Sequence, residues 1–165
     1  MKAELFSSDF MISMFLFFTS LIIIVFYYQN LQTDVYETDI RNDMYSRTIN
    51  IASLLATTQG YPHYWNSTNV KVIGLYESGK FNLTKFEELK NIPYENVKTM
   101  LGTGVYNLNV TLKNVTGNIV GNDTFQYTYG TAIDNAEQLS IVKRLGVINY
   151  QNNTTKVTME VVLWE

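Results

Sequence analysis

The stretch FMISMFLFFTSLIIIVFYY, residues 10–28, decides how this chain can be built. No charged residue interrupts it. As an α-helix rising about 1.5 Å per residue, the stretch is about 28 Å long, which matches the hydrocarbon core of a bilayer. The apolar region of a signal peptide has only about 7–15 residues, and a strand of a soluble core is shorter still. The stretch therefore predicts a transmembrane helix in preference to a buried helix of a soluble domain.

The residues at the two ends of this span suggest its orientation. Tyr27 and Tyr28 are typical of aromatic residues at the membrane interface. The N-terminal flank has Lys2 and the terminal amine against Glu4, whereas the other flank is acidic, so the charge balance slightly favours an N-terminus inside the cell. We expect a leader segment at residues 1–9, a transmembrane helix at 10–28, an amphipathic continuation of that helix at 29–58, and an extracellular head at 59–165.

Asp9 directly precedes the apolar span, and two interpretations of it stay open. It is an N-terminal helix residue at the interface, where an anion suits the helix dipole, or it pairs with a cation inside an assembly of such helices. Ser13 and Ser20 are seven residues apart and would permit close helix approach, or they are incidental in a lone anchor. The face that we expect to contact neighbouring helices consists of Phe10, Ser13, Phe17, Ser20 and Ile24.

The segment after the span continues as a helix. Residues 29–58 contain no glycine or proline, and apolar residues recur there at helical spacing, at Ile40, Met44, Ile51 and Leu55. The acidic residues between them have no calcium-loop spacing, so we interpret them as a solvated face. The sequence Gly60-Tyr61-Pro62 is expected to end the helix.

Two short helices are predicted in the middle of the chain, after a loop at residues 62–80 with one short strand at 71–75. Thr84 and Glu87 form a capping-box pattern that would open the first helix. Pro93 would start the second helix and Gly102 would stop it. The residues expected to face inward are Phe86, Leu89, Val97, Met100 and Leu101. In the loop, we interpret His63, Tyr64 and Trp65 as packing over the core in preference to forming a binding cluster.

The last third of the chain has the two-residue period of strands. Polar and apolar residues alternate over 105–113 and again over 125–129, and the segments 139–150 and 156–164 flank a hairpin connection at 151–154. The predicted fold class is therefore α+β: a long N-terminal helix packed on a small, mostly antiparallel sheet, with two short helices inserted.

The composition excludes several classes of function. The 165 residues carry a net charge of −3, with no cysteine and one histidine. Disulfides, thiolate metal sites and multi-histidine metal sites are therefore excluded, and a mildly acidic chain without a basic run is a poor ligand for nucleic acid. The nucleophile elbow, the phosphate loop and metal-ligand motifs are also absent from the sequence. We expect no catalytic residue, no metal and no cofactor, and hence not an enzyme.

The sequence N-x-[ST] occurs seven times, where chance gives about three. This excess is what an exported domain would show. The seven possible N-glycosylation sites are Asn66, Asn82, Asn109, Asn114, Asn122, Asn152 and Asn153.

Several segments together resemble a known family. LFSSDFMISMFLFF (5–18) looks like the class III signal region of archaeal type IV pilin-like proteins. The likeness continues in TTQGYPHYW (57–65), VIGL (72–75), FNLTKFEELKNIPYENVKTMLGTGVYNLNV (81–110) and VKRLGVINYQNNTTKVTMEVVLW (142–164). The resemblance implies a pilin-like fold and cleavage of the leader by a prepilin peptidase within Ala3, Glu4 and Leu5. Cleavage after Glu4 would make Asp9 the fifth mature residue, where the family's acidic residue pairs with a neighbour's N-terminal amine; cleavage after Ala3 would place it one position late.

The family also implies a function. We expect a major or minor structural subunit of an archaeal type IV pilus-like surface filament, which is a single-pass membrane protein before assembly. Its partners would be copies of itself or related pilins, the prepilin peptidase, the pilus assembly machinery and the membrane. The alternative is a non-polymerising surface module for binding or adhesion, held by a single-pass anchor, with His63, Tyr64, Trp65 and residues 125–129 as its candidate surface.

Overall fold

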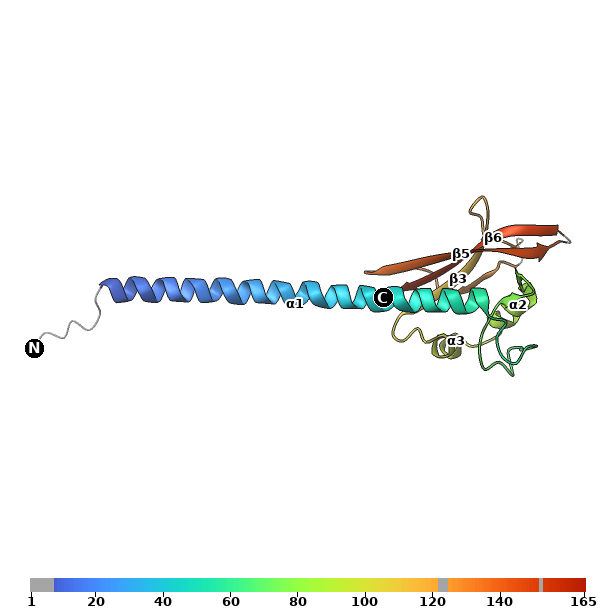
Figure 1. Cartoon of the computed structure of the whole chain (residues 1–165), viewed down its shortest axis with the longest axis horizontal. Coiled ribbons are helices and arrows are strands. Elements are labelled where there is room, and N and C mark those ends of the chain that lie inside the picture. Colours follow the sequence, from blue (N-terminus) through green and yellow to red (C-terminus); the bar gives the residue numbers. More distant parts are fainter. Residues whose placement is uncertain (1–7, 122–124, 152) are drawn as a thin grey trace, which may run out of the picture. The chain divides into compact units, whose positions relative to one another are not determined.

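The computed structural model describes residues 8–121, 125–151 and 153–165, and it has the predicted mixture of a long helix and a small antiparallel sheet (Figure 1). The chain divides into two compact units, Met1–Ile40 and Arg41–Glu165. The elements in chain order are α1 (Ser8–Thr57), β1 (Tyr76–Glu77), β2 (Lys80–Phe81), α2 (Leu83–Lys90), α3 (Tyr94–Leu101), β3 (Asn107–Asn114), β4 (Thr128–Gly130), β5 (Leu139–Tyr150) and β6 (Asn153–Trp164).

Helix α1 includes both the apolar stretch and its predicted amphipathic continuation. It ends at Thr57, one residue before the predicted boundary. Beyond it, Gly60 has a φ of +78°, which glycine adopts without strain. Within the second unit, Met44, Ile51 and Leu55 are buried as the helical spacing predicted. The charged side chains of Asp43 and Arg41 are exposed, so this part of α1 has one apolar face.

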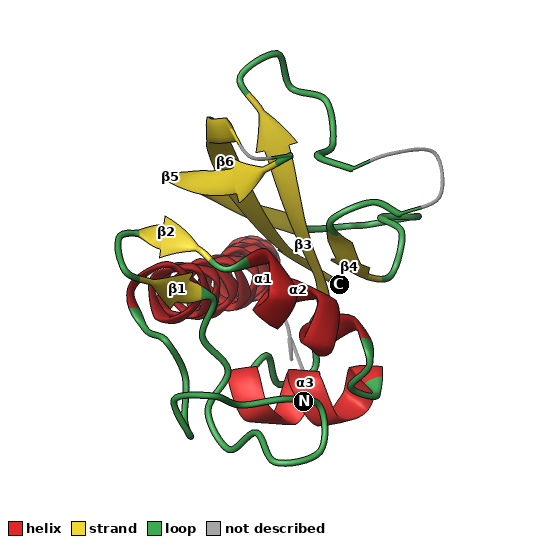
Figure 2. Ribbon diagram, turned by 90° about the vertical axis from the view of Figure 1, so that its right-hand side faces the viewer, coloured by secondary structure: helices red, strands yellow, loops and turns green. Residues whose placement is uncertain are grey.

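The main sheet has the strand order β4-β3-β6-β5, with antiparallel pairing throughout. Strand β6 is therefore central, and Val161 pairs with Val110 of β3 on one side and with Val142 of β5 on the other. Figure 2 shows the sheet beside α1 and α2. A hydrogen bond from Arg144 of β5 to Ser53 of α1 joins the inner face of the sheet to the helix.

The predicted two-residue alternation is confirmed on both central strands, because every second side chain is buried against the core. These buried residues are Leu108, Val110, Leu112, Val157, Met159, Val161 and Leu163. The hairpin connection is shorter than predicted, since Asn153 already pairs with Tyr150 and β6 begins there, not at Lys156. The β-branched Thr154 and Thr155 extend the strand.

The predicted strand at residues 71–75 is wrong. This segment makes only an isolated bridge, between Val72 and Tyr61, and the short strand β1 follows it. Gly74 explains the difference, because a Cβ there would lie 2.4 Å from the backbone oxygen of Thr58. The segment therefore passes too close to the residues that follow α1 to pair as a strand, although Ile73 and Leu75 are buried.

The two inserted helices are confirmed, with two corrections. The N-cap of α2 is Asn82, not Thr84, because the Asn82 side chain accepts a hydrogen bond from the backbone N–H of Lys85. Met100 is 38% exposed, not inward-facing, because Val97 and Leu101, four residues apart, take the buried side of α3. Gly102 ends α3 with a φ of +69°, as predicted.

Candidate functional site

The apolar stretch of α1 is exposed along its whole length in the single chain. Its large apolar side chains, from Phe10 to Tyr28, are between 44% and 71% exposed. Among the described residues, α1 is the one helix that is long and apolar enough to cross a membrane, and none of its most apolar window is buried. Burying each such side chain is worth about 1.5–3 kcal/mol. The stretch therefore has the length and apolar surface of a membrane anchor or a signal sequence.

The predicted assembly face lies on this surface. Phe10, Ser13, Phe17, Ser20 and Ile24 all belong to α1 and are all exposed. The hydroxyl of Ser20 donates to the backbone oxygen of Phe17 at 2.8 Å, which satisfies it inside the helix. The Ser13 hydroxyl makes no hydrogen bond with any described residue, so it is the polar group on this face that is free to bond across a helix pair.

Asp9 lies in the first turn of α1 and is exposed. A carboxylate in the first turn of a helix interacts favourably with the positive end of the helix dipole. This placement agrees with the first interpretation of Asp9, and the second, pairing with a neighbouring chain, stays a prediction. The predicted processing residues Ala3, Glu4 and Leu5 lie outside the described residues.

The three aromatic residues at 63–65 do not form one surface. Trp65 is buried, and its indole N–H is within 3.1 Å of the backbone oxygens of both Gln59 and Gly74. Tyr64 is 81% exposed, and His63 lies 3.5 Å from a carboxylate oxygen of Glu77. The packing interpretation of this segment is confirmed for Trp65, which fixes the loop to the residues around it.

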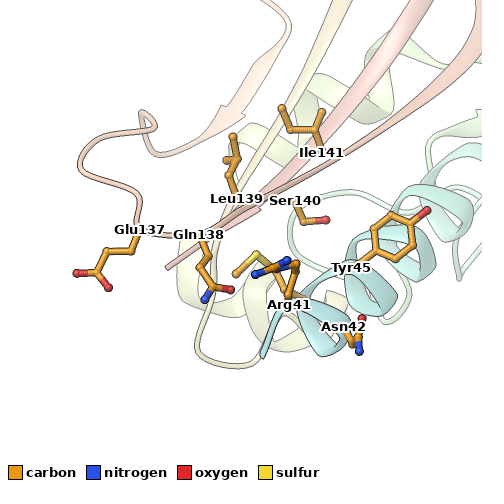
Figure 3. Close-up of a pocket in the computed structure, with 9 residues that line it drawn as sticks. Arg41, Asn42, Tyr45, Glu137, Gln138, Leu139, Ser140 and Ile141 are labelled. Atoms are coloured by element: carbon orange, nitrogen blue, oxygen red, sulfur yellow. The ribbon is translucent and has the colours of Figure 1, made fainter. Parts of the chain in front are cut away.

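A pocket of about 550 Å³ lies in the second unit, and no pattern in the sequence predicted it. The residues that line it come from two segments (Figure 3). One is the first turn of α1 after residue 40, and the other leads into β5 and includes its first residues. Ser140 is only 8% exposed, and neither its hydroxyl nor the amide oxygen of Gln138 has a hydrogen-bond partner among the residues that the structure describes. These residues are separated from α1 by about a hundred positions, so no local pattern could bring them together. The lining residues are Arg41, Asn42, Met44, Tyr45, Glu137, Gln138, Leu139, Ser140 and Ile141.

Both polar and apolar side chains line the pocket. Ser140 has no base within hydrogen-bond reach among the described residues, so it lacks what activates a serine nucleophile. In the described part of the chain, no group of three or more histidine, aspartate or glutamate side chains could hold a metal ion.

An ion network crosses the face of the sheet that points away from α1. Glu160 of β6 contacts Lys113 of β3 at 2.5 Å and Lys143 of β5 at 3.1 Å. Burial raises the pKa of Glu160, but the hydrogen bonds and charges of the two lysines outweigh this and hold the pKa below its ordinary value. The network therefore joins three strands through one carboxylate.

A second carboxylate connects α1 with Tyr106, the residue before β3. Asp43 accepts hydrogen bonds from Arg47 at 2.8 Å and from the hydroxyl of Tyr106 at 3.0 Å. The bond from Arg47, with help from Tyr106, lowers the pKa of Asp43 against the opposing effect of burial. Arg47 also donates to the backbone oxygen of Gly102, which ends α3. One side-chain cluster thus fixes α1 to both elements.

The predicted glycosylation sites occupy different kinds of structure. Asn66 lies in the loop after α1, Asn82 caps α2, Asn109 lies within β3, and Asn114 and Asn153 lie at strand ends. Asn122 and Asn152 are outside the described residues.

Comparison with known proteins does not identify a relative. No family model matches the chain, and no curated protein or solved structure matches it significantly.

Proposed function

We propose that this chain is a structural subunit, major or minor, of an archaeal type IV pilus-like surface filament. The observation that carries the proposal is the uncovered apolar length of α1, from Phe10 to Tyr28. Such a surface is stable in a bilayer, and it can leave the bilayer only when other apolar helices replace the lipid. A bundle of copies of this helix supplies that replacement.

Two further features support assembly. The small serines at positions 13 and 20 lie among large apolar residues and permit close approach of neighbouring helices. The α+β unit that follows has its own buried core, so it can stand outside such a bundle as a folded head. In this proposal the chain is a single-pass membrane protein until a prepilin peptidase removes the leader and the assembly machinery adds the subunit to the filament.

The alternative function is a non-polymerising surface module for binding or adhesion, held by the same helix as a membrane anchor. The exposed Tyr64 is the observation that favours it. Because Trp65 is buried, the aromatic surface that this function would use is smaller than the sequence suggested.

The experiment that tests the proposal is electron microscopy of filaments sheared from cells, with mass spectrometry of their subunits. We expect the chain in the filaments, with a mature N-terminus near residue 4 or 5. A chain that stays in the membrane fraction with an intact Met1–Lys2 start supports the anchored module instead. Full-length protein that is monomeric and soluble without detergent would contradict both functions.

A further inference from the structure

The sequons differ in what the side-chain amide nitrogen of each asparagine does. An N-linked glycan is attached through this Nδ2 atom, so a site must have room at Nδ2 and must tolerate the loss of one of its hydrogens. Five of the seven sequon asparagines lie in the described residues, and their contacts divide them into two groups. The five are Asn66, Asn82, Asn109, Asn114 and Asn153.

The Nδ2 atom of Asn82 is committed to the fold. It donates to Oε2 of Glu77 at 2.5 Å, while its Oδ1 accepts from the backbone N–H of Lys85 and caps α2. The same Glu77 oxygen lies 3.5 Å from the ammonium group of Lys85, whose side chain is almost completely buried. A sugar on Asn82 would have to enter this cluster and would disturb both the helix cap and a buried lysine's partner.

The Nδ2 atom of Asn109 is also committed. Asn109 lies in the middle of β3, where its cross-strand neighbours are Gly130 of β4 and Val162 of β6. Its Nδ2 donates to the backbone oxygen of Thr131 at 2.9 Å. Val162 is only 1% exposed, so the sheet is packed next to Asn109, and a glycan on Nδ2 would disturb both the bond to Thr131 and this packed neighbour.

Asn66 and Asn114 show the opposite arrangement. In each, Oδ1 accepts hydrogen bonds from both the backbone N–H and the hydroxyl of the threonine two residues later. The hydroxyl bonds are 2.7 Å from Thr68 and 2.6 Å from Thr116. Neither Nδ2 donates to any described residue, so the side chain is held by its oxygen and its nitrogen is available.

The surroundings of Asn114 are open as well. The turn that follows it, residues 115–118, is exposed, and Val115 is 77% exposed. The turn at this end of β3 points away from α2 and α3 (Figure 2). Asn153 is also exposed, and its Nδ2 lies 3.5 Å from the backbone oxygen of Gln151, at the limit of a hydrogen bond.

We propose that Asn66, Asn114 and Asn153 carry N-linked glycans and that Asn82 and Asn109 do not. The inference rests on the proposed function, because transfer requires the head to be exported. The co-reactant is a lipid-phosphate-linked glycan. The bond between the anomeric carbon and the phosphate oxygen breaks, an anomeric carbon–Nδ2 bond forms, Nδ2 gives up one proton, and the lipid phosphate leaves.

We expect the same asparagines to carry glycans whether the glycan is transferred before or after the chain folds. After folding, the Nδ2 atoms of Asn82 and Asn109 are both held by hydrogen bonds within the fold. Before folding, a glycan on either residue would block the native contacts described above, and the modified chains would be depleted from the folded protein. In both cases the purified folded chain carries glycans at the loop and strand-end sites.

The register of the sheet places two of these sites together. Asn114 pairs with Val157 at one end of β3, and β6 begins four residues before Val157, at Asn153. The two asparagines therefore lie at the same end of the sheet. We expect glycans on both to cover that end, on the β5–β6 hairpin and the loop after β3.

The test is site-resolved glycopeptide mass spectrometry on the full chain, produced in an archaeal host whose N-glycosylation is verified on a co-expressed reporter. Trypsin places Asn66, Asn82 and Asn109 on separate peptides, residues 48–71, 81–85 and 99–113. Asn114 shares residues 114–143 with Asn122, and Asn153 shares residues 145–156 with Asn152, so fragmentation within the peptide assigns the glycan in these two. We expect a glycan at Asn66, Asn114 and Asn153, and none on residues 81–85 or 99–113.

Matched variants assign residues 114–143, which also contain Asn122. Thr116→Ser keeps the Asn114 sequon and is expected to keep occupancy, whereas Thr116→Ala removes the sequon and is expected to abolish occupancy at Asn114. Equal occupancy at Asn114 in the two variants would overturn the assignment of that site.

Protease treatment of intact cells separates this inference from the proposed function. Digestion of the head by external protease shows that it is exported. If such a head carries a glycan at Asn82 or Asn109, or lacks one at Asn66, Asn114 or Asn153, the proposed choice of glycosylation sites is wrong and the proposed function stands. A chain without glycan whose head is protected from the protease overturns both.

Discussion

The ring of Phe81 lies directly on the backbone of Gly146, so closely that a Cβ on Gly146 would be 2.2 Å from a ring carbon. Phe81 is buried at the end of β2, and Gly146 lies within β5. This contact is the means by which the small β1–β2 hairpin is attached to the edge strand of the main sheet.

We predict that Gly146→Ala destabilises the head, because the buried ring cannot move aside without leaving the core. Overpacking of this kind costs about 1–3 kcal/mol of unfolding free energy. The measurement is thermal unfolding of the full chain in detergent, followed by near-ultraviolet circular dichroism. In a Phe81→Leu background the same alanine should cost clearly less. An equal cost in both backgrounds would show that the ring contact is not the cause.

Glu160→Gln should remove part of the acid sensitivity of the head. The native pKa of Glu160 is lowered by Lys113 and Lys143, so its contribution to stability is present above the ordinary glutamate pKa of about 4.5 and is lost as the pH falls through the lower native pKa. We expect the variant to be about 1–3 kcal/mol less stable at pH 7 and to lose less stability than the wild type between pH 5 and pH 3.

The control for this prediction is Glu137→Gln, which changes the same charge on an exposed side chain. Urea unfolding at a series of pH values measures both variants. If the two variants have the same pH dependence, the Glu160 network does not account for the acid sensitivity.

Asp9→Ala is predicted to reduce incorporation into filaments several-fold while membrane insertion is unchanged. The reason is the proposed pairing of the Asp9 carboxylate with a cation of a neighbouring subunit, which an apolar bundle would make strong. Asp39→Ala changes an exposed acid elsewhere on α1 and is the matched control. Quantitative mass spectrometry of sheared filaments measures incorporation, and that of membranes measures insertion. Equal incorporation of the two variants would rule out the pairing.

Replacing both Ser13 and Ser20 with isoleucine should also reduce assembly, because larger side chains keep neighbouring helices apart. Thr19→Ile is the control, since position 19 lies about 100° around the helix from position 20. Insertion into the membrane should be at least as efficient in all variants because each becomes more apolar. Filament yield is the readout, and a normal yield from the double variant would place the helix contact on another face.

The parts of the fold that the sequence predicted are those with a strong period. The inward alternation of β3 and β6 and the apolar side of α1 follow from residue spacing. Near the end of β6 the opposite face is buried as well, at Val162 and Trp164. Gly102 and Pro93 marked the ends of α3 because their backbone preferences are local.

The parts that were missed depend on distant contacts. Thr84 and Asn82 are both good capping residues, and the choice of Asn82 is favoured by Glu77, which no capping motif includes. Gly74 prevents a strand only because the end of α1 is adjacent to it. The pocket at Ser140 likewise combines two segments that only the folded chain brings together.

The central position of β6 has a consequence for biogenesis. During synthesis, β3 and β5 leave the ribosome before the strand that joins them, so their inner edges stay unpaired until β6 follows. Exposed strand edges are templates for aggregation. Translocation of a still unfolded chain, or a chaperone that holds these edges, would therefore protect the head during the interval before its sheet can close.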